Sequence, residues 1–273
     1  MHKTIKNIDI EIKLLIDAIF HKYGYDLREF LPELLQDKFQ ARLKNSNFKS
    51  FSEMQHKILY DKDFFEIVLA DLTSHPSNNF PNPIFYQNFK KIVNPILKEK
   101  TFFKIWFVGC STGENVYTFS ILLAEEDLLK RSQIYATDFN DLVLSKAREG
   151  IYSLEIINEF EDFYRLSGGK EKFSKYYTVL NNSAVIKHSL RNIVFADHNL
   201  TTDGVFSETD LIVCLNILQN FNEDLRERAI SVFQESLNPN GILCLEPGSD
   251  YKNFVKELKM SELKKGTNIF QKK

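Results

Sequence analysis

The chain of 273 residues is 43% hydrophobic and 26% charged, which is the composition of a globular protein with apolar material for one large core or two modest ones. Its 35 basic and 37 acidic residues leave a formal net charge of −2, so no global field favours nucleic acid or an anionic membrane as a partner. No uninterrupted apolar run reaches the ~18 residues that span a bilayer, so we expect a cytoplasmic protein without membrane insertion.

The first third of the chain has the apolar spacing of helices. Apolar residues recur every three or four positions from residue 8 to about residue 97, which predicts an all-helical domain over residues 1–97. The segment LTSHPSNNFPNP, residues 72–83, interrupts this spacing with three prolines and several Asn and Ser residues. It predicts an ordered loop, followed by a short helix that ends near Leu97.

After Lys104 short apolar runs alternate with helical stretches, which indicates βαβ units and a parallel sheet over residues 98–273. A helix is expected from about Asn115 and another through Ala147. Within residues 173–191 we expect a small inserted β-hairpin, because Asn tolerates the positive φ of a tight turn at 181 and 182. The expected strands cover residues 105–109, 134–138, 192–196, 210–215, 241–247 and 268–272.

The strongest local signal is IWFVGCSTGEN, residues 105–115, in which an apolar strand runs through Gly109, Ser111 and Gly113 into a helix. Three interpretations compete. A dinucleotide-binding loop is disfavoured because Ser111 replaces the second glycine of G-x-G-x-x-G. A serine-hydrolase nucleophile elbow is disfavoured because no His follows His198 and no convincing strands precede residue 104.

The third interpretation is the nucleoside-binding loop of a class I methyltransferase with a Rossmann-like fold. Asp138 ends the strand IYATD 25 residues after Gly113, where an acid binds the ribose diol in such folds. Its alternative is the N-cap of the helix that follows Asn140. Glu114 is placed to contact the amino group of the cofactor, or alternatively to stabilise the helix dipole.

The three cysteines are far apart in the sequence and fit neither a CxxC motif nor a Cys/His metal spacing. We expect reduced, buried thiols at Cys110, Cys214 and Cys244, and no metal site.

The loop over residues 105–115 and the strand that ends at Asp138 resemble those of the CheR-type chemotaxis methyltransferases. Members of this family methylate glutamates on the signalling helices of chemoreceptors. WFVGCSTGEN resembles the family's W-x-x-G-C-S-x-G-E-E loop, and ATDFN resembles its ribose-binding ATDI segment. The resemblance runs over nearly the whole chain and includes the helical N-terminal domain and the inserted hairpin. The segments EGIY, NIVFADHNL, DLIVCLNILQNF and LNPNGILCLEPGSD follow in family order.

The resemblance implies S-adenosyl-L-methionine as cofactor, S-adenosyl-L-homocysteine as product and chemoreceptor cytoplasmic helices as partner. Asn199 and Leu200 are expected near the adenine, and Asn216 in the loop after the fourth strand, unless it only caps the next helix. The expected cofactor-binding residues are Gly109, Ser111, Gly113, Glu114, Asp138, Asn199, Leu200, Asn216, His75 and Ser77.

The chain departs from the family where the methyl group is transferred. The family's interdomain loop carries Asn, Thr and Arg toward the reaction centre, where this chain has His75, Ser77 and Pro81. The family's second Arg and its Tyr correspond to Leu215 and Asn220. An arginine fork suits a carboxylate, and proline and leucine cannot replace it.

Three functions therefore stay open. The first is a protein-glutamate O-methyltransferase in which other groups, such as His75, Lys90 or Lys91, replace the arginines. The second is a catalytically impaired regulatory protein that still binds the cofactor. The third is a methyltransferase with a changed substrate.

A basic stretch, residues 38–49, matches the family helix that faces the acidic receptor. Lys38, Arg42 and Lys44 are expected either to steer an acidic helical partner or to form an ordinary solvated helix face. The hairpin at 176–190 matches the family's receptor-docking subdomain, but it is short and carries little charge.

Overall fold

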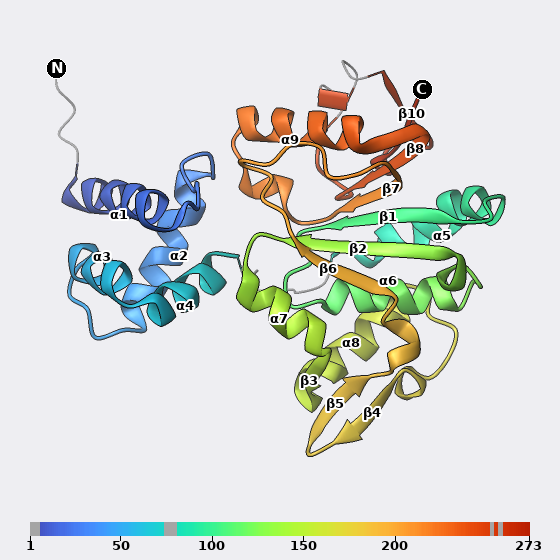
Figure 1. Cartoon of the computed structure of the whole chain (residues 1–273), viewed down its shortest axis with the longest axis horizontal. Helices are drawn as coiled ribbons and strands as arrows, with labels where there is room; N and C mark the ends of the chain where they lie inside the picture. The colour runs from blue at the N-terminus through green and yellow to red at the C-terminus, as the bar shows by residue number, and fades with distance from the viewer. Residues whose placement is uncertain (1–5, 74–80, 252–253, 256–258) are drawn as a thin grey trace. The chain divides into compact units, whose positions relative to one another are not determined.

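The computed structural model describes residues 6–73, 81–251, 254–255 and 259–273 (Figure 1). The chain divides into two compact units. One consists of Met1–Ser74 with Asn220–Arg226, and the other of His75–Gln219 with Glu227–Lys273.

The first unit is helical, as predicted. Its helices bury an apolar stripe that includes Leu15, Ile19 and Phe39, which is how an amphipathic helix gains most of its stability. The returning segment joins this unit through Phe221, whose ring lies 5.1 Å from that of Phe30 in an edge-to-face contact. Its described helices are α1 (Asn7–Tyr23), α2 (Pro32–Lys44), α3 (Phe51–Tyr60) and α4 (Lys62–Thr73).

The helix α5 (Pro83–Lys98) groups with the second unit, although the sequence analysis assigned residues up to 97 to the helical domain. Its 16 residues also make it longer than the short helix expected. The reason is its apolar face: Phe85, Phe89 and Val93 are at most 4% exposed and belong to the same core as β1 and α6. Most of the loop expected over residues 72–83 lies outside the described residues.

The second unit is built on a sheet with the strand order β6-β2-β1-β7-β8-β10-β9. Neighbouring strands are parallel among β6, β2, β1, β7 and β8, and β10 and β9 add an antiparallel edge. The predicted α/β fold of the class I methyltransferase type is confirmed. The strands are β1 (Phe103–Val108), β2 (Ser132–Asp138), β6 (Ile193–Asp197), β7 (Thr209–Cys214), β8 (Leu237–Leu245), β9 (Met260–Glu262) and β10 (Ile269–Lys272).

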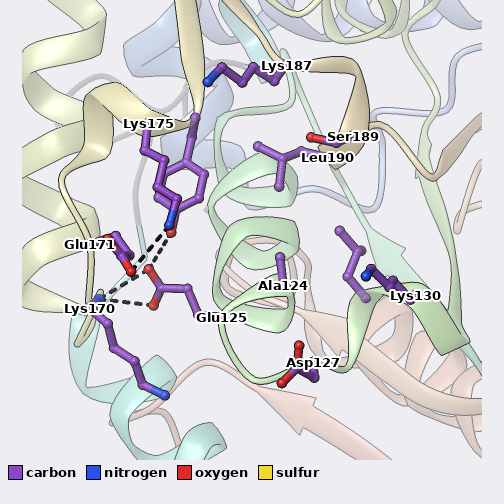
Figure 2. Close-up of a pocket in the computed structure, with 12 residues that line it drawn as sticks. Ala124, Glu125, Asp127, Lys130, Lys170, Glu171, Lys175, Lys187, Ser189 and Leu190 are labelled. Carbon is purple, nitrogen blue, oxygen red and sulfur yellow. Dashed lines mark hydrogen bonds and ion pairs between the residues drawn. The ribbon is translucent and has the colours of Figure 1, made fainter.

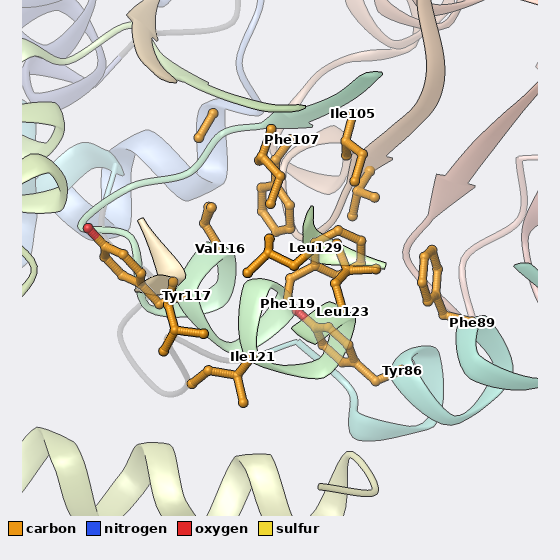
Figure 3. Close-up of a cluster of buried hydrophobic side chains, with 14 of the residues drawn as sticks. Tyr86, Phe89, Ile105, Phe107, Val116, Tyr117, Phe119, Ile121, Leu123 and Leu129 are labelled. Atoms are coloured by element: carbon orange, nitrogen blue, oxygen red, sulfur yellow. The ribbon is translucent and has the colours of Figure 1, made fainter. Parts of the chain in front are cut away.

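Helices cover both faces of this sheet, which explains why its central strands are almost continuously apolar. The helices α5, α6 (Glu114–Ala124) and α7 (Asp141–Glu149) lie on one face, and α9 (Glu223–Ser236) lies on the other (Figure 1). The core between α6 and the sheet holds Phe107, Phe119 and Ile105 (Figure 3), each at most 2% exposed.

The inserted subdomain contains more than the predicted hairpin. The strands β4 (Tyr177–Leu180) and β5 (Ser183–Ile186) form that hairpin, with Asn181 and Asn182 at φ +46° and +63° as the two-residue turn requires. A third strand, β3 (Ile151–Ser153), pairs with β5, and α8 (Leu154–Leu166) follows it. Neither was predicted. The strand β3 has only three residues and a partner about thirty residues away along the chain, whereas α8 carries an amphipathic period that could have been recognised.

Short 3-10 helices complete the described elements: η1 (Leu129–Arg131), η2 (Phe173–Lys175), η3 (His188–Leu190) and η4 (Leu218–Asn220). The cysteines carry free, buried thiols at Cys110, Cys214 and Cys244. In the part of the chain that the structure describes, no helix combines the length and apolarity needed to cross a membrane.

Candidate functional site

The order of the strands defines where a ligand binds. From β1 the chain proceeds outward to β2 and β6 on one side, and it later returns to β7 and β8 on the other. The carboxyl ends of β1 and β7 therefore flank the point at which the strand order reverses, which is where open α/β sheets bind their ligands. Gly109 follows β1 and Leu215 follows β7, so the predicted loop lies at this point.

The loop after β1 is fixed to the end of β2 by backbone hydrogen bonds. The Cys110 amide donates to the Thr137 carbonyl at 2.9 Å, and the Ser111 amide donates to Asp138 Oδ2 at 3.0 Å. Ser111 has φ +48°, a left-handed conformation that is uncommon for a residue with a side chain. The loop thus turns sharply so that its amide reaches the carboxylate.

Two glycines in this loop are required by close packing. A Cβ on Gly109 would lie 2.3 Å from Ile217 Cδ1, so the segment after β7 closes over the turn after β1. A Cβ on Gly113 would lie 3.1 Å from both the Ala147 Cβ and the Tyr152 hydroxyl. Both glycines also have positive φ, +67° and +95°, which glycine adopts at little cost.

Asp138 is the most perturbed carboxylate of the loop region. It is 7% exposed, and burial raises its pKa to about 6, opposed by hydrogen bonds from the backbone amides of Ser111, Asn140 and Phe139. The N-cap of α7 is Asn140, whose Oδ1 accepts from the Leu142 amide at 3.0 Å, so Asp138 does not fill that role. A carboxylate offers about four lone-pair positions, which leaves Asp138 with acceptor capacity for a hydroxyl ligand.

Glu114, the first residue of α6, is 4% exposed. The Thr112 hydroxyl lies 2.5 and 2.6 Å from its two carboxylate oxygens and donates to them. Burial raises the pKa of Glu114, and the Thr112 hydrogen bond opposes the shift. With the Thr112 hydroxyl and its own backbone amide as donors, the buried carboxylate still has unused acceptor positions. A first-turn glutamate that only stabilises the helix dipole can do so while exposed to water.

The residues after β6 form a compact turn. Asn199 Oδ1 accepts from the Thr201 amide at 3.0 Å and from its hydroxyl at 2.7 Å, so this side-chain oxygen is occupied within its own turn. Leu200 is buried at 6% exposure. The preceding His198 is tied to β2, because its amide donates to the Asp138 carbonyl at 3.2 Å. Contact of Asn199 and Leu200 with an adenine stays a prediction.

Asn216 lies directly beyond the end of β7 and has φ +64°. Its amide donates to Glu246 Oε2 at 2.8 Å, and with its side-chain amide oriented toward the carboxylate, Nδ2 lies 3.1 Å from Glu246 Oε1. Glu246 follows the last residue of β8. Glu246 was not among the predicted site residues, although it follows a buried strand just as Asp138 ends one.

The positions that differ from the family lie in different parts of the fold. Pro81 and Leu215 are buried and apolar in the second unit. Asn220 belongs to the first unit, where its carbonyl accepts from the Leu31 amide at 2.9 Å. The predicted cofactor residues His75 and Ser77 lie outside the described residues.

The lysines considered as substitutes for the arginines do not gather at the loop. Lys90 forms an ion pair with Glu126, 3.2 Å away, just beyond the carboxyl end of α6. Since α6 begins at Glu114, this pair lies at the opposite end of the helix from the loop. Lys91 is exposed on α5.

Another residue that the sequence analysis missed is Tyr152 of β3, whose hydroxyl donates to the Thr112 carbonyl at 2.8 Å. This bond ties the inserted subdomain to the loop after β1. The segment EGIY was quoted only for its likeness to the family, and no local signal connects it to a carbonyl forty residues earlier in the chain.

A cavity of about 470 Å³ lies beside the end of α6 and the inserted subdomain (Figure 2). Its lining mixes acids such as Glu125 with lysines such as Lys170, whose amide donates to Glu125 Oε2 at 3.0 Å. Because α6 separates this cavity from the loop at its other end, the cavity is no part of the site at the carboxyl edge of the sheet.

Two of the three basic residues assigned to a partner surface have intramolecular partners instead. Lys38 is 9% exposed, and its Nζ donates to the carbonyls of Asp71 and Leu72 at the end of α4. Arg42 forms an ion pair with the Asp71 carboxylate. Both residues are thus held at the carboxyl end of α4, and a role of these residues in steering a partner stays a prediction.

Known proteins similar to this chain agree with the geometry. The profile described as "CheR methyltransferase, SAM binding domain" matches residues 76–266. A provisionally named methyltransferase, Cher3 of Pseudomonas putida, is 44% identical over 241 residues, covering 88% of each chain. The chemotaxis protein methyltransferase of Salmonella typhimurium is 28% identical, and the match covers 92% of this chain and 88% of the relative. That of Borreliella burgdorferi is 27% identical, and the match covers 88% of each chain. The chain therefore belongs to the CheR family of methyltransferases, whose cofactor is S-adenosylmethionine.

Proposed function

We propose that this protein transfers a methyl group from S-adenosylmethionine to glutamate carboxylates on the cytoplasmic helices of chemoreceptors. The proposal is supported by relatives named as chemotaxis protein methyltransferases that match most of the chain. The single observation that carries it is the loop after β1 bound to the buried carboxylate of Asp138, at the point where the strand order reverses.

The residues present at this edge fit the cofactor. With three backbone amides bound, Asp138 keeps about one acceptor position for a ribose hydroxyl, and Glu114 keeps unused acceptors for an ammonium group. Neither carboxylate forms an ion pair within the described residues. When bound, S-adenosylmethionine supplies an electrophilic methyl group on a cationic sulfonium.

The protein has little acid-base work to do in such a transfer. A glutamate acceptor has a reference pKa of about 4.3, so it is ionised at neutral pH and needs no general base. Its carboxylate must be held in line with the methyl group, and orientation of this kind contributes much of the rate. The two family arginines, which this chain replaces with Pro81 and Leu215, would therefore matter chiefly for positioning the acceptor carboxylate.

A second function, a regulatory protein that binds the cofactor without transferring the methyl group, is favoured by the side chains at the family's arginine positions. Pro81 and Leu215 are buried and offer no side-chain donor. Restoring arginine at either position is no clean test, because burying an unpaired guanidinium would itself destabilise the fold. A changed acceptor is the third possibility.

The experiment combines calorimetric titration with S-adenosylmethionine and transfer of a labelled methyl group to receptor-containing membranes. Carboxyl methyl esters release methanol in mild alkali, whereas methylated amines do not, so lability of the label identifies the acceptor chemistry. Alkali-labile label on the receptor supports the proposal. Cofactor binding without transfer supports the regulatory protein, and alkali-stable label supports a changed acceptor.

A further inference from the structure

Glu246, like Asp138, is held at the carboxyl edge of the sheet by several hydrogen bonds. Its carboxylate accepts from the Asn216 amide at 2.8 Å, from the Asn216 side chain and from the backbone amide of Asn82. Asn82 is the N-cap of α5, with its own Oδ1 bonded to the Ile84 amide at 3.0 Å. The acid therefore joins the loop after β7 to the start of α5, and its side chain is held in place.

The acids of the second unit differ sharply between the two ends of the sheet. At the amino ends of the strands Asp210 forms an ion pair with a lysine, and Glu126, beyond the end of α6, pairs with three. Among the described residues, Glu114, Asp138 and Glu246 at the carboxyl ends form no ion pair. This edge thus carries carboxylates that have no ion-pair partner in the described part of the chain, although the charge of Lys146 acts on Glu114 through space.

We propose that Glu246 is a specificity-determining residue that favours the cationic cofactor, S-adenosylmethionine, over the neutral-sulfur product, S-adenosylhomocysteine. Asp138 lies at the end of β2, and Glu246 lies across the reversal point, directly beyond the end of β8, the neighbour of β7. A cofactor whose ribose is held at β2 and which extends across the loop after β1 brings its sulfonium toward the β7 and β8 side. The inference rests on the cofactor and does not depend on the acceptor.

The two ligands isolate the effect of the charge. They share the adenine, the ribose, the amino group and the carboxylate, and they differ in one methyl group and one positive charge on sulfur. A carboxylate that only holds the loop in place contributes equally to both affinities. A carboxylate that attracts the sulfonium contributes to one of them, by an amount that Coulomb's law makes appreciable in a partly buried site.

The test is calorimetric titration of the full chain and of Glu246→Gln with each ligand, at about pH 8 so that the acid is ionised. We expect the variant to bind S-adenosylmethionine about fivefold to tenfold more weakly while its affinity for S-adenosylhomocysteine changes less than about twofold. Glu246→Asp keeps the charge, and its affinity ratio should stay close to that of the unmodified protein.

The chain offers a matched control in Glu262 of β9, whose Oε1 accepts from three backbone amides, those of residues 266, 267 and 268, at 2.8 to 3.0 Å. It also holds a loop in place, but it lies at the far edge of the sheet. Glu262→Gln should leave the affinity ratio unchanged. Equal weakening of both ligands by Glu246→Gln, or an unchanged ratio, would overturn the proposal even though the protein still bound its cofactor.

Discussion

Affinity for the cofactor should depend on pH through Asp138. Burial raises the pKa of this carboxyl to about 6, and ribose hydroxyls donate best to its ionised form. A group with that pKa is about 90% ionised at pH 7 and about 9% ionised at pH 5. The dissociation constant for S-adenosylhomocysteine should therefore rise about tenfold between pH 7 and pH 5.

The same shift predicts an opposite trend for stability without ligand. The folded pKa lies above the reference value of 3.8, so between these two values the folded protein binds a proton that the unfolded chain has released. The contribution of Asp138 to stability is thus present below about pH 4 and is lost as the pH rises to 6, by about 3 kcal/mol. Urea unfolding of the protein and of Asp138→Asn across this range measures the difference.

Asp138→Asn should lower affinity at pH 7 by about 1 to 3 kcal/mol, since a buried hydrogen-bonding group is lost. It should also abolish the tenfold pH dependence, as seen by calorimetric titration at several pH values. Asp210→Asn is the control, because Asp210 lies at the amino end of the sheet beside Lys100. If Asp138→Asn kept the full pH dependence, the proton would belong to another group, and the assignment of Asp138 would be refuted.

Three further substitutions test the packing around the site. Gly109→Ala places a Cβ 2.3 Å from Ile217 Cδ1, so it should lower both the melting temperature and the affinity for the cofactor. Adding Ile217→Ala removes the clashing side chain and should recover part of the loss. If the double variant recovered nothing, the clash would not be the cause. Tyr152→Phe removes the 2.8 Å hydrogen bond to the Thr112 carbonyl and should weaken cofactor binding by about 0.5 to 1.5 kcal/mol. Unchanged affinity would show that this bond between the inserted subdomain and the loop does not contribute to cofactor binding. Lys38→Met should destabilise the protein by about 1 to 3 kcal/mol in urea unfolding at pH 7, because the last carbonyls of α4 lose their donor.

The Lys38 prediction has a pH signature as well. Burial lowers the pKa of Lys38 from 10.5 to about 8, so between these values the unfolded chain binds a proton that the folded protein has released. Stability should accordingly rise with pH from 8 to 10.5 in the unmodified protein relative to Lys38→Met. Parallel stability curves for the two proteins over that range would contradict the assignment.

Local sequence patterns were sufficient wherever one segment forms both the structure and the site. The loop through Gly109, Ser111 and Gly113 sits between a strand and a helix as predicted, and Asp138 lies within hydrogen-bonding distance of it. The apolar run predicts the strand, the glycines predict the turn, and the apolar period predicts the helix. All three signals come from residues that are close together in the sequence.

Other residues acquired their roles only through contacts between distant segments. The sequence left Lys38 as either a partner-facing or a solvated charge, and only the packing of α2 placed it against the end of α4. Glu246 was expected within a strand over residues 241–247, and it gained its hydrogen-bond partner after β7 only when β8 paired beside β7. The helix α5 belongs to the second unit because its apolar face packs into the core of the sheet. By itself the sequence determined the α/β class, the glycine loop and the acid at the end of β2, since these follow from local periodicity and turn chemistry. Tertiary structure decided which charges are buried, which are ion-paired and which lie at the carboxyl edge of the sheet without an ion pair, because burial and pairing depend on which distant segments pack together.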